Sequence, residues 1–242
     1  MEYGIMAGVN ISTIQKKIRQ LGNNEIAAHS QRFFKTGKGD YGEGDRFLGI
    51  RVPILRKLAK QYKGTPLVDV LTLLKSVYHE ERLISLLMMV SLFSRGGEEE
   101  QNAIYEAYLE NTGYINNWDL VDSSARHIVG AYLLTRSRGP LYRLADSKNL
   151  WERRISIMST FHFIRKEDFD DTLNLSEKMK QDPEDLIHKA VGWMLREIGN
   201  RNMAIEERFL KKHYQNMPRT MLRYAIEKFP EDKRQAYLKG KI

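Results

Sequence analysis

The chain has 242 residues, of which 42% are hydrophobic, and it contains no cysteine. This length allows a substantial core, either in one domain or in an array of small repeats. The absence of cysteine excludes disulfides, thiol catalysis and cysteine-ligated zinc. The 39 Lys and Arg residues exceed the 31 Asp and Glu residues, and the resulting charge of +8 at pH 7 favours a polyanionic partner without identifying one.

The sequence predicts no contact with a membrane. Its longest apolar stretch, residues 83–93, is much shorter than the ~20 residues that a transmembrane helix needs, and charged residues flank it. Residues 1–14 contain no positively charged segment followed by an apolar one, so we expect no secretory signal. We therefore expect a cytoplasmic protein.

Apolar residues recur every three or four positions along most of the chain, as in amphipathic helices, and no run alternates as in a half-buried strand. This periodicity is clear in residues 55–62, 67–74 and 104–109. Glycine, proline and polar turn residues interrupt it at residues 22–24, 63–66, 95–97, 138–140, 182–183, 217–218 and 229–230. These breaks predict about a dozen helices.

A short helix alternates with a longer amphipathic one, with a period of ~40 residues, which is typical of HEAT-like repeats. We therefore expect an all-α fold, a HEAT-like helical-repeat solenoid (α-α superhelix), formed by a single domain over residues 1–242. The similarity between the repeats is faint, so a compact all-α bundle is the alternative. A solenoid would present the same helix of each pair on its concave side, where residues far apart in sequence can meet.

A glycine-rich segment, residues 35–53, breaks the helical pattern. It contains five glycines, and Pro53 suits the first turn of the next helix. It lacks both the Gly-Lys-Ser/Thr ending and the preceding strand of a nucleotide-binding P-loop. A flexible connector at about residues 35–50 is one interpretation. A contact with the DNA backbone is the other, through Lys35, Lys38, Arg46 and Arg51.

The last part of the chain is strongly basic. Residues 201–242 contain eleven Lys or Arg residues and five Asp or Glu residues, a net charge of +6. A solvated face that aids solubility and a nucleic-acid contact would both explain this excess.

Trp118 and Asp122 are four residues apart, so in a helix they share one face and set an aromatic ring beside a carboxylate. Asp119 is the rival carboxylate, but it points about a hundred degrees away from Trp118 on a helix. A structural role is the alternative for both residues, because a helical Trp commonly anchors a core and Asp122 could be a helix cap.

The six histidines show no spacing that is typical of a metal site: His29, His79, His127, His162, His188 and His213. We therefore expect neither a metal nor another cofactor.

Four blocks in register resemble the AlkD-type DNA alkylation repair family of bacteria. They are residues 47–53 (FLGIRVP), 116–122 (NNWDLVD), 150–155 (LWERRI) and 190–197 (AVGWMLRE). The resemblance extends over residues 26–238. Each block alone is weak, but the four in this order are specific.

The resemblance implies a helical-repeat protein that binds duplex DNA in a concave basic groove. It also implies a DNA glycosylase that releases cationic N3- and N7-alkylated purines. The aromatic cleft of the family corresponds to Trp118 and Trp193, its carboxylate to Asp122, and its arginine to Arg154. Adjacent Arg153 and Arg154 face differently, and only the register of the block selects Arg154. The further expected DNA contacts are Lys38, Arg46, Arg51, Arg153, Arg196, Lys211, Lys212 and Arg219.

The protein would act in base excision repair as a monomer in the bacterial cytosol or nucleoid. Two features depart from the best-known members of the family: the longer segment from Lys35 to Asp45, and Arg51, where those members can carry an uncharged polar residue. The family also includes members that bind damaged or branched DNA without excising bases. A non-catalytic DNA binder is therefore the alternative, and a scaffold that binds peptides on its concave face is a third.

Overall fold

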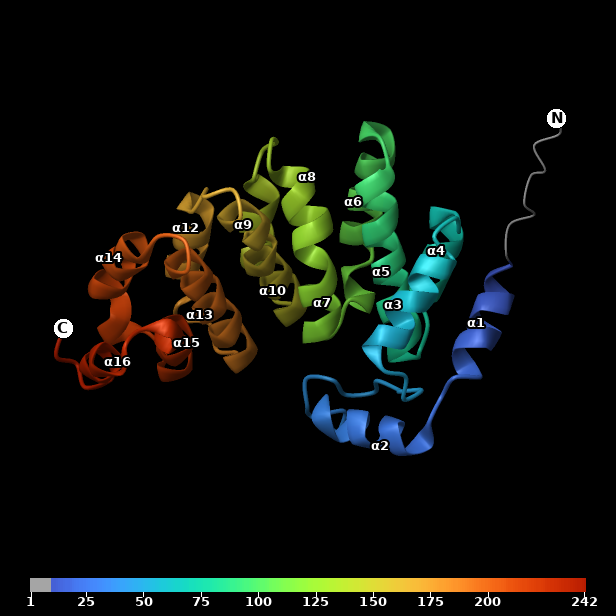
Figure 1. The fold of residues 1–242 in the computed structure, drawn as a ribbon, viewed down its shortest axis with the longest axis horizontal. Helices are drawn as coiled ribbons and strands as arrows, with labels where there is room; N and C mark the ends of the chain where they lie inside the picture. Colours follow the sequence, from blue (N-terminus) through green and yellow to red (C-terminus); the bar gives the residue numbers. More distant parts are fainter. Residues whose placement is uncertain (1–9) are drawn as a thin grey trace. The chain divides into compact units, whose positions relative to one another are not determined.

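The computed structural model describes residues 10–242, and these form helices without any β-strand (Figure 1). Residues 1–14, for which the sequence predicts no secretory signal, lie largely outside this range. The all-α prediction is confirmed, and helices begin or end at each of the seven predicted breaks. The chain divides into two compact units, one ending at Ser124 and the other spanning Ala125–Ile242.

The first unit is built around α5 (His79–Arg95), which contacts α3, α4 and α6. Eleven successive residues of α5, from His79 to Met89, are buried, because this helix has neighbours on most of its circumference. The other helices of this unit are α1 (Ile11–Arg19), α2 (Asn24–Phe33), α3 (Val52–Gln61), α4 (Leu67–Leu74), α6 (Glu98–Glu110), the short 3-10 turn η1 (Thr112–Tyr114) and α7 (Trp118–Ala125).

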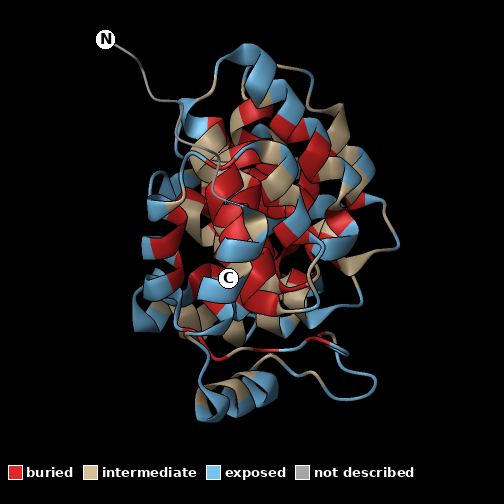
Figure 2. Ribbon diagram, turned by 90° about the vertical axis from the view of Figure 1, so that its right-hand side faces the viewer, coloured by how far each residue is buried: buried red, intermediate tan, exposed pale blue. Residues whose placement is uncertain are grey.

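Helix α2 has no buried residue, and its ribbon in Figure 2 has only the colours of intermediate and exposed residues. Its first turn is capped by Asn23, whose side chain accepts a hydrogen bond from the Ile26 amide at 2.9 Å. The chain after α2 forms tight turns instead of a helix. It passes close to the start of α2 again at Gly49, which has a φ of 80°. A side chain at Gly49 would overlap the Asn23 carbonyl, so only glycine lets the loop pass α2 so closely.

The second unit is built around α13 (Asp185–Gly199), which contacts α10, α12, α14 and α15. Gly192 on α13 allows α15 to approach, because a Cβ there would overlap the Met221 carbonyl. The other helical elements of this unit are η2 (Arg126–Gly130), α8 (Ala131–Leu133), α9 (Gly139–Ala145), α10 (Leu150–Ser159), α11 (Phe161–Ile164), α12 (Asp170–Met179), α14 (Met203–His213), η3 (Tyr214–Asn216), α15 (Arg219–Ala225), η4 (Ile226–Lys228) and α16 (Glu231–Leu238).

Helices that follow one another in the chain pack as pairs within each unit, as in α4 with α5, α9 with α10, and α12 with α13. This arrangement is that of successive helical hairpins joined by short connections. It agrees with the predicted helical-repeat class.

Candidate functional site

Trp118 and Asp122 lie on α7, and both are partly exposed. The side-chain oxygen of Asn117 accepts a hydrogen bond from the Trp118 amide at 2.8 Å, so the helix starts at the residue that carries the indole. The opposite side of α7 is held in the core by Leu120, Val121 and Ser124, all buried. The spacing of Trp118 and Asp122 therefore places them on the more accessible side of one helix, as the sequence predicts.

Phenylalanines from α2 and the glycine-rich segment pack against Trp118. The Phe34 ring stacks on the indole with centroids 5.2 Å apart and an interplanar angle of 19°, and the Phe33 ring meets it edge-on at 6.0 Å. Phe47 stacks in turn on Phe34 at 5.0 Å. No spacing in the sequence predicts a role for these phenylalanines, because their contacts with Trp118 join segments about eighty residues apart. The adjacent pair Phe33-Phe34 beside a glycine-rich segment was the only signal.

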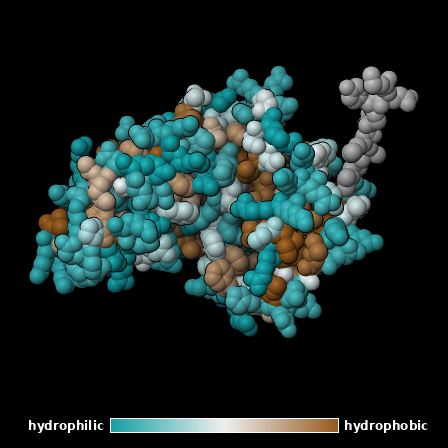
Figure 3. All heavy atoms as spheres, viewed as in Figure 1, coloured by the Kyte–Doolittle hydropathy of each residue, from teal (hydrophilic) through white to brown (hydrophobic). Residues whose placement is uncertain are grey.

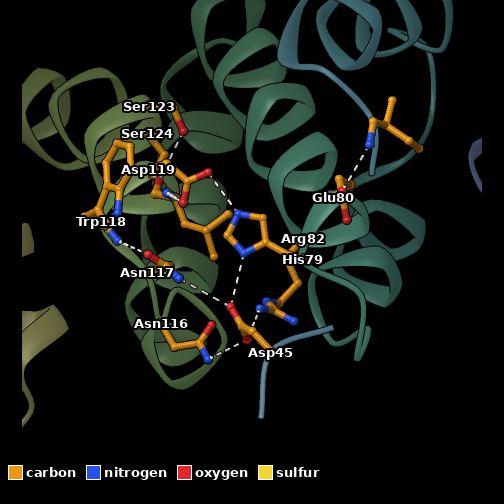
Figure 4. A network of polar contacts seen from close by, with 12 residues as sticks. Asp45, His79, Glu80, Arg82, Asn116, Asn117, Trp118, Asp119, Ser123 and Ser124 are labelled. Carbon is orange, nitrogen blue, oxygen red and sulfur yellow. Dashed lines mark hydrogen bonds and ion pairs between the residues drawn. The ribbon is translucent and has the colours of Figure 1, made fainter. Parts of the chain in front are cut away.

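A buried polar network lies under this aromatic stack (Figure 4). His79 Nδ1 is 3.1 Å from a carboxylate oxygen of Asp45, and His79 Nε2 is 2.8 Å from one of Asp119. Arg82 donates to Asp45 at 2.5 Å, and Asn116 and Asn117 donate to the same carboxylate at 3.3 and 3.4 Å. The network joins the end of the glycine-rich segment to α5 and α7.

Electrostatics keep the network ionised. Burial disfavours the charged imidazolium, but the Asp119 and Asp45 carboxylates outweigh it and raise the pKa of His79 to about 9. Burial alone would raise the pKa of Asp45, but the hydrogen bond from His79 and the charge of Arg82 hold it below its ordinary value. At neutral pH the network therefore contains two cations and two anions.

A neighbouring residue, Glu80, shapes the loop that precedes α3. Its carboxylate accepts hydrogen bonds from the backbone amides of Leu48, Gly49 and Ile50 at 2.8, 2.8 and 3.2 Å. The predicted basic residue Arg51 follows this turn and is exposed. Glu80 thus fixes the backbone from which Arg51 projects.

The first unit also contains a cavity of about 520 Å³ between α2, the 47–52 segment and the starts of α5 and α7. Its walls combine aromatic and charged groups, among them His29, Phe34, Phe47, Arg51, His79 and Asp119. Trp118 and Asp122 are not among the residues that line it. The cavity nevertheless adjoins Trp118 through Phe34, which lines the cavity and stacks on the indole.

Trp193 lies on α13 in the second unit and is partly exposed. Its indole Nε1 donates to the Glu197 carboxylate at 3.2 Å, and the Phe161 ring lies 6.0 Å away. Arg201 binds the same carboxylate at 2.9 Å and also lies over the Phe161 ring, 5.9 Å from its centroid. Trp193 is thus held in a cluster of aromatic and ionic side chains.

The two adjacent arginines of α10 have different environments. Arg154 is only 4% exposed, and its guanidinium donates to the Leu186 carbonyl at 2.6 Å. Arg153 instead forms a two-point ion pair with Asp182, at 2.6 and 3.2 Å, and donates to two backbone carbonyls. A DNA contact by Arg153 would require this pair to open.

The four predicted catalytic residues are divided between the two units. Trp118 and Asp122 belong to the first unit, and Arg154 and Trp193 belong to the second. Their convergence around one reacting nucleotide stays a prediction, as does the concave basic groove.

The predicted DNA-contacting cations fall into two groups. Arg153 and Arg196 are paired with acidic groups, since Arg196 forms an ion pair with Glu227. Lys212 is also paired, with Glu177 at 3.5 Å, although it is exposed. The others are exposed as well: Lys38, Arg46, Arg51, Lys211 and Arg219. The surface of Figure 3 is mainly hydrophilic, with hydrophobic patches in the part formed by α2 to α4. Exposed apolar side chains of these helices include Phe33, Val52 and Ile54.

Two further findings concern residues 10–242. No helix in this range has the length and apolar character needed to span a membrane. No group of three or more His, Cys, Asp or Glu residues in this range is arranged to hold a metal ion.

The fold and the site describe an all-helical protein with exposed cations and with paired aromatic and carboxylate side chains on one helix. The sequence model of the DNA alkylation repair enzyme family matches residues 14–229, and the chain belongs to this family. Membership of a DNA repair family implies that the protein binds DNA.

The fold is similar to that of a solved structure described as a predicted DNA alkylation repair enzyme from Enterococcus faecalis. The two chains are 19% identical and superpose with a TM-score of 0.67, over 87% of this chain and 97% of the other. The similarity supports the helical-repeat fold. No match was found among functionally curated proteins.

Proposed function

We propose that the protein is a monofunctional DNA glycosylase that hydrolyses the N-glycosidic bond of cationic N3- and N7-alkylated purines in duplex DNA, as a step of base excision repair. The observation that carries this proposal is the pair formed by Trp118 and Asp122 on the accessible side of α7, in a chain of the DNA alkylation repair family. A role in DNA repair would locate the protein with the DNA, in the cytosol or nucleoid of a bacterium.

The chemistry needs few groups from the protein. Alkylation at N3 or N7 makes the purine a cation, so the base departs as a neutral molecule when the C1′–N bond breaks, and it needs no general acid. Positive charge then develops on the sugar, and a water molecule adds to C1′ and releases one proton. A carboxylate can stabilise the charge and accept this proton from the water. We assign this role to Asp122.

Trp118 and Trp193 would flank the nucleotide and attract its positive charge through their ring faces. Such a cation–π contact contributes ~0.5–2 kcal/mol, depending on how far the cation is desolvated. Phe34 already stacks on one face of Trp118. Phe33 also contacts that indole, so a nucleotide would bind to the ring surface that Phe33 and Phe34 leave uncovered.

Arg154 is buried and donates to the Leu186 carbonyl, so it would supply a fixed positive charge beside the site that attracts a phosphate of the damaged strand without direct exposure of its guanidinium. The exposed cations would hold the DNA backbone on either side: Lys38, Arg46, Arg51, Lys211, Lys212 and Arg219. These contacts are independent of base sequence, so the charge and the weak glycosidic bond of the lesion would provide the selectivity.

The central experiment replaces Asp122 with Asn. Purified protein is incubated with duplex DNA that contains 7-methylguanine, and the released base is identified by mass spectrometry under single-turnover conditions. Because Asn cannot carry the negative charge, we expect Asp122→Asn to slow release by about a hundredfold or more, with DNA affinity nearly unchanged.

The matched control is Asp146→Asn, which removes an exposed carboxylate paired with Lys178 in the second unit. It should release the base at the wild-type rate. Equal rates for Asp122→Asn and the wild type would remove Asp122 from the mechanism.

A second candidate function is the binding of damaged or branched DNA without excision. The stacking of Phe34 on Trp118 favours it, because this contact uses one ring face for packing. In that case the wild-type protein would release no base, and it would bind branched duplexes more tightly than plain ones.

A further inference from the structure

We propose that His79 is a positioning residue for the reaction, which bridges Asp45 and Asp119 and thereby orients the first turn of α7 with Trp118 and Asp122. This inference rests on the proposed function. It concerns residues of the first unit alone, and Asp45, His79 and Asp119 are joined in the polar network of Figure 4.

The geometry requires His79 to carry a charge. Both ring nitrogens face carboxylate oxygens, Nδ1 toward Asp45 at 3.1 Å and Nε2 toward Asp119 at 2.8 Å. An ionised carboxylate can only accept hydrogen bonds, and a neutral imidazole has only one N–H. Only the imidazolium can therefore donate to both carboxylates at once.

The surroundings of His79 contain more acidic than basic side chains. Its own helix contributes Arg82, which binds Asp45, while Glu80 accepts from three loop amides and Glu81 pairs with Arg19 of α1. The ring centroids of Phe47 and Phe34 lie 4.5 and 5.1 Å from the centroid of the His79 ring. The cavity beside the ring is also lined by titratable or charged groups of α2 and the following loop, which are Glu25, His29 and Arg51. Loss of the proton from His79 would leave Asp45 with Arg82 and leave Asp119 without its cation.

The bridge acts on α7 through Asp119. One Asp119 oxygen bonds to His79 and the other accepts from the Leu120 amide at 2.9 Å, so the carboxylate ties the first turn of the helix to α5. Trp118 precedes Asp119, and Asp122 lies one turn later on the same side of the helix as Trp118. A rotation of this turn would move both groups relative to a bound nucleotide.

The bridge also reaches the glycine-rich segment. Asp45 is buried at the end of this segment, next to the exposed Arg46, and Lys38 lies on its turns. A phosphate contact by these cations would therefore be coupled, through Asp45, to the network that holds α7. Asp45 and Asp119 come from segments more than seventy residues apart in the chain.

The test replaces His79 with Gln, which retains a donor able to reach Asp119 but lacks the charge. We expect the single-turnover excision rate of His79→Gln to fall about tenfold to a hundredfold, because small misplacement of reacting groups costs this much. DNA affinity should remain within about twofold, since His79 is buried and contacts no DNA. The rate ratio of wild type to variant should shrink as the pH rises through 9, where the wild type also loses the charge.

Glu81→Gln is the matched control. Glu81 lies two positions away on α5 and is equally buried, but it holds Arg19 and Ser76 rather than α7. Both variants are compared at a temperature where both are fully folded. Glu81→Gln should excise at the wild-type rate. Equal losses in the two variants, or no loss in His79→Gln, would overturn the proposal.

A second readout does not depend on activity. The indole N–H resonance of Trp118 should shift with an apparent pKa of about 9 in the wild type and not in His79→Gln, while the resonances of Trp151 and Trp193 should not follow this titration. If the wild type releases no base, the proposed function fails while this titration still tests the bridge. A Trp118 resonance that does not respond to His79 ionisation would overturn the positioning role.

Discussion

Adjacent residues in this protein have very different roles because their side chains leave the helix in different directions. Arg153 is held by Asp182, whereas Arg154 reaches the backbone of α13. In the same way, Asp119 is held by His79, while Asp122 lies on the side of α7 that carries Trp118. The nearest rivals of Asp122 and Arg154 are thus each used in a structural ion pair.

Glu206 gives a prediction about stability and pH. Its side chain is 1% exposed, and Oε1 finds no hydrogen-bond partner among residues 10–242. Burial raises the pKa of Glu206 to about 8, although the charges of Arg196 and Lys233 oppose this shift. A carboxyl with a raised pKa stabilises the fold fully below its unfolded value near 4.5, and this contribution is lost as the pH rises through 8.

We therefore expect Glu206→Gln to be more stable than the wild type at pH 9 and to differ little from it at pH 5. Urea unfolding at the two pH values measures this. His79 also has a raised pKa, so its contribution is complete below about 6.5 and disappears as the pH rises through 9. The wild type should accordingly lose stability in two overlapping steps, from about pH 4.5 to 8 for Glu206 and from about pH 6.5 to 9 for His79. A constant difference between Glu206→Gln and the wild type at all pH values would contradict the assignment.

The α2 helix and the loop after it are held mainly by a few contacts at their ends. Glycine at position 49 has a φ of 80°, and its amide and the two adjacent amides bind the buried Glu80 carboxylate. These contacts position the aromatic residues that stack on Trp118. The integrity of this loop therefore bears on the site as well as on stability.

We expect Gly49→Ala to destabilise the protein by about 3 kcal/mol or more, since the new Cβ combines an unfavourable φ with an overlap with the Asn23 carbonyl. Gly64→Ala is the control, because nothing lies within 4 Å of a Cβ at Gly64. Chemical denaturation compares the free energies of unfolding. A loss as small as that of the control would show that α2 shifts at little cost.

The exposed cations of the chain should govern its affinity for DNA through their contacts with phosphates. The formal charge is +8, and Lys211, Lys212 and Arg219 are exposed. Phosphate contacts release condensed counterions, so binding should weaken steeply with salt. The logarithm of the binding constant should fall with the logarithm of the salt concentration, with a slope of about 0.9 per phosphate contact. Weak dependence on salt would instead favour a protein scaffold.

We expect the triple variant Lys211→Ala, Lys212→Ala and Arg219→Ala to bind DNA more weakly on all sequences alike and to show a smaller salt slope. The control replaces three cations that are paired with neighbouring acids, namely Lys178, Lys189 and Arg234, and so removes the same formal charge. Fluorescence anisotropy at several salt concentrations distinguishes the two. A loss confined to one DNA sequence would contradict backbone binding.

The amino-acid sequence alone determined the local features of this protein. The all-helical class, the positions of the breaks and the shared face of Trp118 and Asp122 follow from periodicity and from glycine and proline, which act over a few residues. Four short blocks in register were enough to indicate the family.

Only the tertiary structure decided which distant side chains meet. It showed Phe34 on Trp118, His79 between Asp45 and Asp119, and Arg196 with Glu227. No spacing rule predicts such contacts, because they depend on how whole helices and loops pack together rather than on the local repeat of a helix. The ionised state of His79 is decided in the same way, since its carboxylates come from two other segments of the chain.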